Sequence, residues 1–176
     1  AALLASCGSK NQYVIEGQIE GSNDWVYLFD QEDNVLDSAA VKEGAFRFKG
    51  TAEEPQMALL RDARDESATF VTVLLLEPGT IQVKDDPENP MRKRVTGTPA
   101  NDASTLYNDT AYQLITEYRD SSTTEERRAA IEKEYADLAQ KVVEKNRNNI
   151  FGAMLLADQM SYELSGQELL DQIAQF

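Results

Sequence analysis

The sequence predicts an α+β protein in which an N-terminal antiparallel β-sandwich or barrel is followed by a C-terminal segment of about four helices. Apolar residues alternate with polar ones through the first half of the chain, as they do in strands. Clusters of turn-forming residues separate these stretches, which is typical of hairpin-rich β folds. After Gly97-Thr98-Pro99 the apolar residues recur at helical spacing instead. We therefore divide the 176 residues into a leader at 1–11, a β domain at 12–98 and a helical segment at 99–176.

Seven stretches of the β domain show a strand pattern. The clearest is 45–49, where two phenylalanines alternate with two basic residues. Because successive side chains of a strand point to opposite faces, the phenylalanines should be buried while the basic residues face solvent. The residues that we expect in the core on this pattern include Ile15, Phe46, Phe48 and Leu76. The expected strands cover 13–19, 25–29, 45–49, 57–60, 70–76 and 81–83, with a short one around 95.

Turn signals mark the ends of the expected strands. They lie at 21–24, 33–34, 43–44 and 78–79. Pro78 followed by Gly79 favours a type II turn, because proline presets its φ angle and glycine accepts a positive φ. The segment 85–90, which contains three acidic residues and two prolines, then interrupts the alternation and predicts an acidic loop.

Apolar stripes at helical spacing predict the helices of the second half. The first stripe runs from 107 to 118 and the second from 131 to 143. Ser122 and Glu125 form a capping-box pattern, in which each side chain would satisfy a free backbone N–H at the start of the second helix. Residues 146–149 mark the end of that helix, and a third helix starts near Phe151. A second capping-box pattern, at 165–168, opens a short fourth helix.

The inventory of reactive side chains excludes most catalytic sites. The chain has no histidine and one cysteine, so it cannot build a Ser-His-Asp triad, a Cys-His pair, a redox pair of cysteines or a common zinc site. We therefore predict no catalytic residue, no metal and no cofactor. The formal net charge is −14 and no basic stripe exists, which argues against nucleic acid as a partner. No apolar stretch is long enough to span a membrane.

Two features are candidate binding sites, and each also has a plainer structural interpretation. Asp85, Asp86 and Glu88 could supply oxygen ligands to Ca²⁺, but they lack the spacing of a calcium loop, and a solvated loop is the preferred interpretation. Trp25 and Tyr27 share one face of an expected strand and could form a platform on which a sugar stacks. Aromatic residues at strand spacing more often belong to the core.

The beginning of the chain carries a localisation motif. Leu4-Ala5-Ser6-Cys7 has the pattern of a bacterial lipobox, in which the cysteine becomes the lipidated first residue of the mature protein. The residues before Cys7 would then be the end of a signal peptide. The polar segment 8–11 argues against the alternative that Cys7 belongs to a core. The bacterial modification supplies two or three acyl chains, and two or more chains hold a protein firmly on a membrane. We therefore expect the membrane as a partner, through lipid on Cys7.

Three phrases, in order, resemble a known family. They are VKEGAFRFKG at 41–50, LEPGTIQV at 76–83 and VTGTPAND at 95–102. Together they resemble the domain of unknown function found N-terminal to thioredoxin-like domains in envelope lipoproteins of Bacteroidota. The resemblance covers 11–120 and extends more loosely to the end. It implies a small β-sandwich, then helices, then a thioredoxin-like domain of the peroxiredoxin/TlpA type. This sequence has no Trp-Cys-x-x-Cys motif, so no catalytic residue of the family maps onto it.

Our first hypothesis is a non-catalytic accessory or spacer module of a lipid-anchored thiol–disulfide oxidoreductase in the bacterial cell envelope. We expect it to face the periplasm, because no acidic residues follow Cys7 as they do in surface-exported lipoproteins of that phylum. The expected partners are the membrane and a C-terminal thioredoxin-like domain, and a homodimer through the helical segment is a further candidate. The alternative is a glycan- or peptide-binding module that uses Trp25 and Tyr27. A stand-alone enzyme is the least favoured hypothesis.

Overall fold

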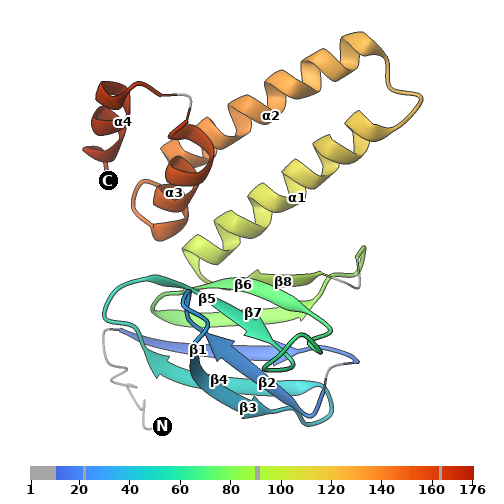
Figure 1. The fold of residues 1–176 in the computed structure, drawn as a ribbon, viewed down its shortest axis with the longest axis vertical. Coiled ribbons are helices and arrows are strands. Elements are labelled where there is room, and N and C mark those ends of the chain that lie inside the picture. Colours follow the sequence, from blue (N-terminus) through green and yellow to red (C-terminus); the bar gives the residue numbers. More distant parts are fainter. Residues whose placement is uncertain (1–10, 22, 90–91, 163) are drawn as a thin grey trace, which may run out of the picture. The chain divides into compact units, whose positions relative to one another are not determined.

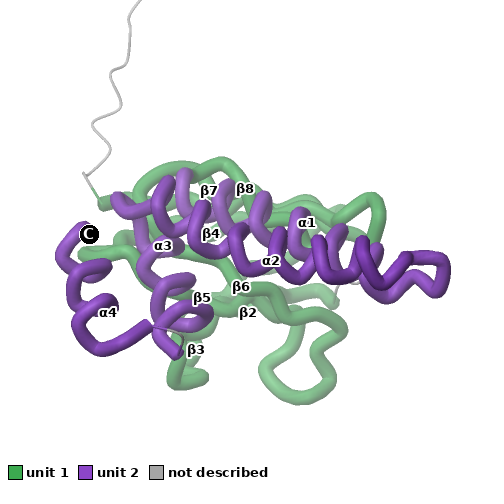
Figure 2. The backbone as a smooth tube through the Cα atoms, turned by 90° about the horizontal axis from the view of Figure 1, so that it is seen from above, with its two compact units in different colours: residues 1–98 green, residues 99–176 purple. Residues whose placement is uncertain are grey.

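The computed structural model describes residues 11–21, 23–89, 92–162 and 164–176. The chain divides into two compact units, 1–98 and 99–176 (Figures 1 and 2). The candidate lipidation site, Cys7, lies outside the described residues. The strands of the first unit are β1 (Gln12–Gln18), β2 (Trp25–Phe29), β3 (Val35–Ala40), β4 (Ala45–Thr51), β5 (Gln56–Arg61), β6 (Val71–Leu76), β7 (Gly79–Asp85) and β8 (Lys93–Thr96).

The strands form two four-stranded sheets that pack as a sandwich. One sheet has the order β4-β1-β7-β8 and the other has the order β3-β2-β5-β6. The α+β class and the sandwich are therefore confirmed, and the sheets do not close into a barrel. The seven expected strands are all present, within a few residues at their ends. The sequence pattern missed β3, because this edge strand buries no side chain fully and so shows no apolar alternation.

One strand pair departs from the antiparallel expectation. β1 pairs with β7 in parallel, from Tyr13 opposite Gly79 to Gln18 opposite Lys84, whereas its other neighbour, β4, is antiparallel. Between β1 and β7 the chain builds the whole second sheet and one edge of the first, so no tight turn constrains the direction in which β7 returns. Periodicity within a strand carries no information about the direction of a distant partner.

Pro78 and Gly79 join the two sheets instead of forming a hairpin. β6 belongs to one sheet and β7 to the other, so the chain passes from one sheet to the other at this point. Gly79 has a φ of 132°, which confirms the expected positive φ. Residues with a side chain rarely adopt this conformation, and glycine at this position lets the chain change sheets within two residues.

The core of the β unit lies between the facing sheets. Ile15, Phe46, Phe48 and Leu76 are all buried, and the basic residues of β4 are exposed, as the alternation predicted. The Phe46 and Phe48 rings meet edge to face with centroids 5.9 Å apart. The Phe46 ring also covers the backbone of its cross-strand partner Gly17, where an added Cβ would lie only 2.0 Å from ring atoms. A residue without a side chain is therefore required opposite Phe46.

The second unit is helical. Its elements are α1 (Pro99–Arg119), α2 (Glu125–Lys145), α3 (Ile150–Leu155), a π-helical turn η1 (Leu156–Met160) and α4 (Gly166–Ile173). The capping box at the start of α4 is confirmed, with Ser165 accepting from the Glu168 N–H and Glu168 accepting from the Ser165 N–H. Among the described residues, no helix has the length and apolar character needed to cross a membrane.

The capping box expected at the start of α2 is wrong. The N-cap is Thr124, whose hydroxyl accepts a hydrogen bond from the Arg127 N–H at 3.2 Å. Ser122 is engaged elsewhere, because its N–H and its hydroxyl both donate to the Asp120 carboxylate, at 2.7 and 2.6 Å. These bonds from Ser122 hold the pKa of Asp120 below its usual value. Asp120 begins the α1–α2 connection with a local turn that includes Ser122, and α2 therefore starts beyond Ser122.

We expect Phe46→Ala to lower the free energy of unfolding by about 3–5 kcal/mol, because a buried ring is lost and the space closes only in part. Gly17→Ala should also be destabilising, because the new Cβ would collide with the Phe46 ring. In a protein that already carries Phe46→Ala, the Gly17→Ala change should cost much less. Urea titrations of the single and double variants, followed by circular dichroism, measure this coupling.

Lys49→Ala, on the exposed face of the same strand, is the matched control and should change the free energy of unfolding by less than about 0.5 kcal/mol. A loss under about 1 kcal/mol for Phe46→Ala, or additive losses in the double variant, would contradict the packing of Phe46 on Gly17.

Candidate functional site

The aromatic candidates lie on the outer face of the sheet β3-β2-β5-β6. Val26 and Leu28 of β2 point into the core and are fully buried, so the intervening residues face outward. Trp25 is 48% exposed. Tyr27 is half-buried, and the guanidinium of Arg64 lies 4.8 Å from its ring centroid. Trp25 therefore offers an open aromatic surface, whereas one face of Tyr27 is already occupied.

The loop that carries Arg64 is fixed by a buried carboxylate. Asp62 is 1% exposed and accepts the N–H of Thr69 at 2.8 Å and the Thr69 hydroxyl at 2.5 Å. It also accepts a longer hydrogen bond, of 3.4 Å, from the N–H of Phe70. Asp62 lies at the start of the β5–β6 loop, and these hydrogen bonds join it to the end of the same loop. The sequence carries no signal for the burial of Asp62, because an aspartate at the end of a strand usually faces solvent.

The acidic loop binds cationic side chains of its own hairpin. Asp85 accepts from the Lys93 ammonium at 2.5 Å and from the Glu20 N–H at 2.7 Å. Asp86, with its side chain 1% exposed, accepts from Arg92 Nε at 2.6 Å and from the Glu88 N–H at 2.9 Å. The solvated-loop interpretation is therefore wrong for Asp86, whose carboxylate is buried.

These contacts decide the protonation of Asp86. Burial raises its pKa, but the hydrogen bond from the Glu88 N–H and the charge and hydrogen bonds of Arg92 together hold the pKa below its usual value. Arg94 lies 3.7 Å away and adds a smaller effect in the same direction. The carboxylate is thus ionised and already neutralised. Within the described part of the chain, no three His, Cys, Asp or Glu side chains gather into a group that could hold a metal ion.

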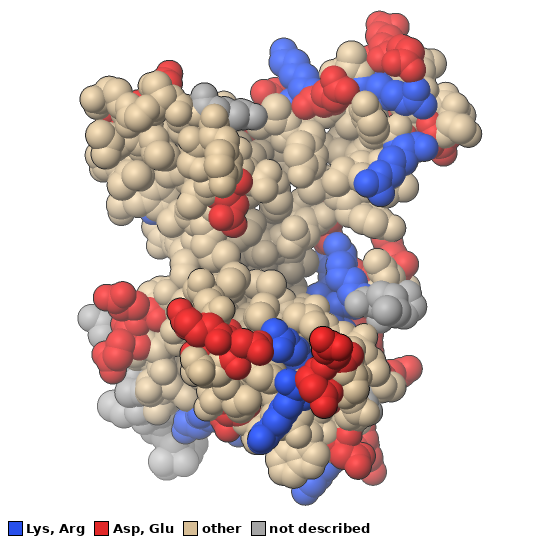
Figure 3. Space-filling model, in the orientation of Figure 1, with Lys and Arg blue, Asp and Glu red and all other residues tan. Residues whose placement is uncertain are grey.

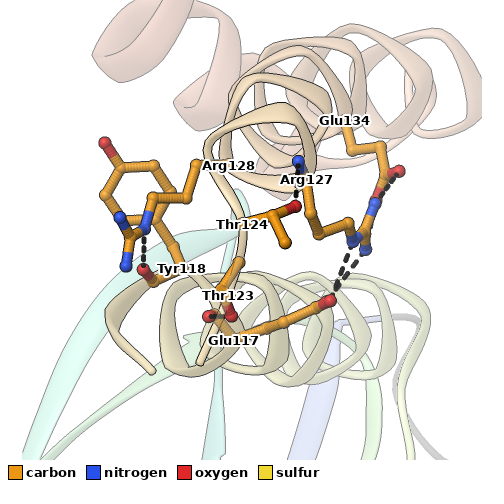
Figure 4. Close-up of polar contacts among 7 residues, drawn as sticks. All are labelled: Glu117, Tyr118, Thr123, Thr124, Arg127, Arg128 and Glu134. Atoms are coloured by element: carbon orange, nitrogen blue, oxygen red, sulfur yellow. Dashed lines mark hydrogen bonds and ion pairs between the residues drawn. The ribbon is translucent and has the colours of Figure 1, made fainter. Parts of the chain in front are cut away.

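A third polar cluster fastens the corner between α1 and α2 (Figure 4). Arg127 donates to Glu117 at 2.8 Å and to Glu134 at 2.6 Å, which raises the pKa of its guanidinium. Arg128 donates to the backbone carbonyl oxygens of Tyr118 and Asp120, each at 3.2 Å. Arg127 therefore links the two helices, and Arg128 covers carbonyl groups that the end of α1 leaves without helical partners.

A hollow on the β unit borders the strand of the aromatic candidates without including them, and two of its lining residues, Ser38 and Ala40, pair with Tyr27 and Trp25. It has a volume of about 650 Å³, and its walls are the edges where β3 and β4 come together beside β1. The ion pair between Arg47 and Glu16, 3.5 Å apart, lies at this hollow. Its lining residues are Glu16, Gly17, Ser38, Ala39, Ala40, Lys42, Ala45, Phe46 and Arg47. The structure therefore does not place Trp25 and Tyr27 in this groove.

Charges of both signs are interspersed over the surface. On the face shown in Figure 3, lysines and arginines lie beside aspartates and glutamates and do not gather into a basic patch. Ion pairs account for part of this pattern, for example Arg61 with Asp33 at 2.7 Å. The arrangement of Asp62, Asp86 and Arg127 holds loops and corners in place. None of the three faces a nucleophile or an acid–base partner in a cavity described above.

We expect Asp86→Asn to destabilise the protein at neutral pH by about 1–3 kcal/mol, because asparagine cannot pair with Arg92. The folded-state pKa of Asp86 is lowered, so its contribution is present above the unfolded-state pKa of about 3.9 and is lost as the pH falls through the folded-state value. The difference between the variant and the original protein should therefore shrink in acid. Thermal melts over a range of acid to neutral pH measure it.

Glu88→Gln is the control for this experiment, since it removes an exposed charge from the same loop. If Asp86→Asn and the original protein were equally stable at neutral pH, the carboxylate would not hold the loop as described.

Comparison with known proteins places the β unit in a family. No curated protein matches the chain. A family model described as a domain of unknown function (DUF4369) matches residues 13–104, which span every strand of the sandwich and the first residues of α1. The match covers more than half of the chain, and the chain belongs to the DUF4369 family.

Proposed function

We propose that this chain is a non-catalytic accessory module of a lipid-anchored thiol–disulfide oxidoreductase in the bacterial cell envelope. In this proposal a thioredoxin-like domain elsewhere in the protein carries the redox cysteines. The DUF4369 match agrees with the family to which the sequence phrases pointed, and it supports that part of the resemblance. The thioredoxin-like neighbour and the bacterial phylum rest on the resemblance alone.

The observation that carries the proposal is that the buried carboxylates accept hydrogen bonds from their own loops. Asp62 and Asp86 are the kind of buried acid that an active site employs, yet each is satisfied by groups of its own loop. Satisfied in this way, a buried carboxylate adds rigidity instead of reactivity. A rigid sandwich followed by a fastened helical hairpin suits a spacer that holds another domain at a distance from the membrane.

A glycan- or peptide-binding module is the second candidate. One observation favours it, which is the 48% exposure of the single tryptophan, Trp25, on a sheet face. Exposed aromatic rings are common in carbohydrate and peptide sites. The accessory role is better supported, because Tyr27 lies against Arg64 and the hollow between β3 and β4 is lined by other residues.

The anchor can be tested through Cys7. Cys7→Ser should move the protein from the membrane fraction to the soluble fraction in the cell, because the thiol that receives the lipid is gone. Circular dichroism of the variant should match that of the original protein. A Cys7→Ser protein that still sediments with membranes would show that the anchor lies elsewhere, and an unfolded variant would show that Cys7 belongs to a core.

The accessory role can be tested by insulin reduction with dithiothreitol. This chain should not accelerate the reaction, because disulfide exchange needs a thiolate and a catalytic cycle needs a second cysteine. A longer form of the protein that includes a Cys-x-x-Cys domain should accelerate it. Acceleration by this chain would overturn the accessory role, and inactivity of the longer form would overturn the link to an oxidoreductase.

A further inference from the structure

The turn between β3 and β4 starts a hairpin that opens after one residue pair. Lys42 and Ala45 exchange two backbone hydrogen bonds of 2.9 Å, and the two residues between them have φ angles of 52° and 80°. Positive φ angles at both positions are typical of the type I′ turn that joins paired strands. The next residue, Val41, instead donates its N–H to the Asp24 carbonyl oxygen, at 2.8 Å. β3 and β4 therefore leave the turn in different sheets.

This opening leaves one edge of the sandwich uncovered. β4 is an edge strand, and among the described residues it pairs with β1 and with no strand on its other side. The hollow of about 650 Å³ lies at the start of this edge, lined by residues 45–47 of β4 and 38–40 of β3. The side chains of 38–40 are serine and alanine, so β3 contributes no large group that would fill the hollow. The backbone of the β4 edge is therefore open to a further strand.

The outer face of β4 is basic. Arg47 and Lys49 alternate with the buried phenylalanines of this strand, and both are exposed. Arg47 Nε lies 3.5 Å from a carboxylate oxygen of Glu16 on β1, whereas neither Lys49 nor Lys42 forms an ion pair within the described part of the chain. A row of three cations thus follows this edge, in a protein whose net charge is −14.

The edge of β3 is less suited to an added strand. Asp37 of β3 lies opposite the core residue Leu28 and so occupies an inward-facing position. Burial and the charge of Asp37 together raise the pKa of Tyr13, which belongs to the core. An inward-pointing charge on an edge strand opposes further pairing. β4 has phenylalanines at its inward positions, so it is the edge that accepts a strand.

We propose that the β4 edge binds an extended peptide segment of another protein, in which acidic residues alternate with apolar ones. An extended backbone continues the sheet and pairs with the N–H and C=O groups along the edge. Alternate side chains of the segment then share the outer face with Arg47 and Lys49, where carboxylates form opposite-charge cross-strand pairs. The intervening side chains face the same side as the phenylalanines, which favours apolar residues. This inference goes beyond the accessory role and does not depend on it.

The same cations argue against a second copy of the chain on this edge. A two-fold pairing of two β4 strands centred on Phe48, for example, would place Arg47 opposite the partner's Lys49. Like charges directly opposite each other destabilise a strand pair. The edge therefore discriminates against itself and in favour of an acidic segment, through repulsion as well as attraction.

Fluorescence anisotropy with a labelled peptide tests the proposal. The peptide has alternating glutamate and valine, blocked ends and the length of β4, seven residues. Arg47→Glu and Lys49→Glu should each raise its Kd about twofold to tenfold, because each reverses a cross-strand charge pair. The variant with both changes should bind a lysine–valine peptide more tightly than the glutamate–valine peptide.

Lys84→Glu is the matched control for these variants. Lys84 is exposed on β7, which has neighbours on both sides, and the substitution changes the net charge by the same amount. This variant should bind the glutamate–valine peptide like the original protein. Circular dichroism of all variants checks that the sandwich remains.

Two methylated peptides test the backbone pairing. One carries N-methyl groups on its valines and the other on its glutamates, so the blocked N–H groups lie on opposite edges of the extended peptide. One form should lose binding by about tenfold or more, and the other should keep it, because only one edge of the peptide pairs with β4.

The proposal is overturned if the glutamate–valine peptide does not bind the original protein at millimolar concentration. It is also overturned if Lys84→Glu weakens binding as much as the β4 variants do, or if both methylated forms keep or both lose binding. Oligogalacturonate, an acidic glycan without a peptide backbone, should bind at least about tenfold more weakly than the peptide. Equal binding of the two would show that the edge recognises charge alone, and the proposal would fail.

Discussion

The sandwich depends on β1, because this strand has neighbours on both sides and contributes to the centre of the core. It pairs antiparallel with β4 and parallel with β7, and the fully buried Ile15 lies at its middle. Gly17 lets the Phe46 ring lie directly on the backbone of β1. Because Phe46 belongs to β4 and Gly17 to β1, this contact sets the position of β4 relative to β1 by shape as well as by hydrogen bonds.

Two buried carboxylates hold loops of the sandwich through hydrogen bonds. Asp62 closes the β5–β6 loop, and Asp86 holds the loop before β8 through a backbone N–H and arginine. Leaving a carboxylate buried without such partners would be strongly unfavourable. These two carboxylates therefore serve the packing of their own loops. This role is consistent with a module that supports other domains.

The helical hairpin separates its charged and apolar surfaces. Arg127 and its two glutamates occupy one side of the turn, and Ile115, Tyr118 and Tyr135 line the other. Exposed ion pairs add little stability individually, so the bridge by Arg127 mainly sets the geometry of the corner. The apolar side is filled by α3 near the base and open near the turn.

Features that depend on neighbouring residues could be predicted from the sequence. Alternation at 45–49 was enough to bury Phe46 and Phe48, and the pair Ser165 and Glu168 was enough to start α4, because both patterns act within a few residues. Two of the three family phrases, at 41–50 and 76–83, lie within strands and turns of the sandwich, and the third, at 95–102, runs from β8 into α1. The parallel pairing of β1 with β7 and the burial of Asp86 could not be predicted in this way. Strand direction and the partners of a carboxylate depend on segments that meet only when the chain has folded.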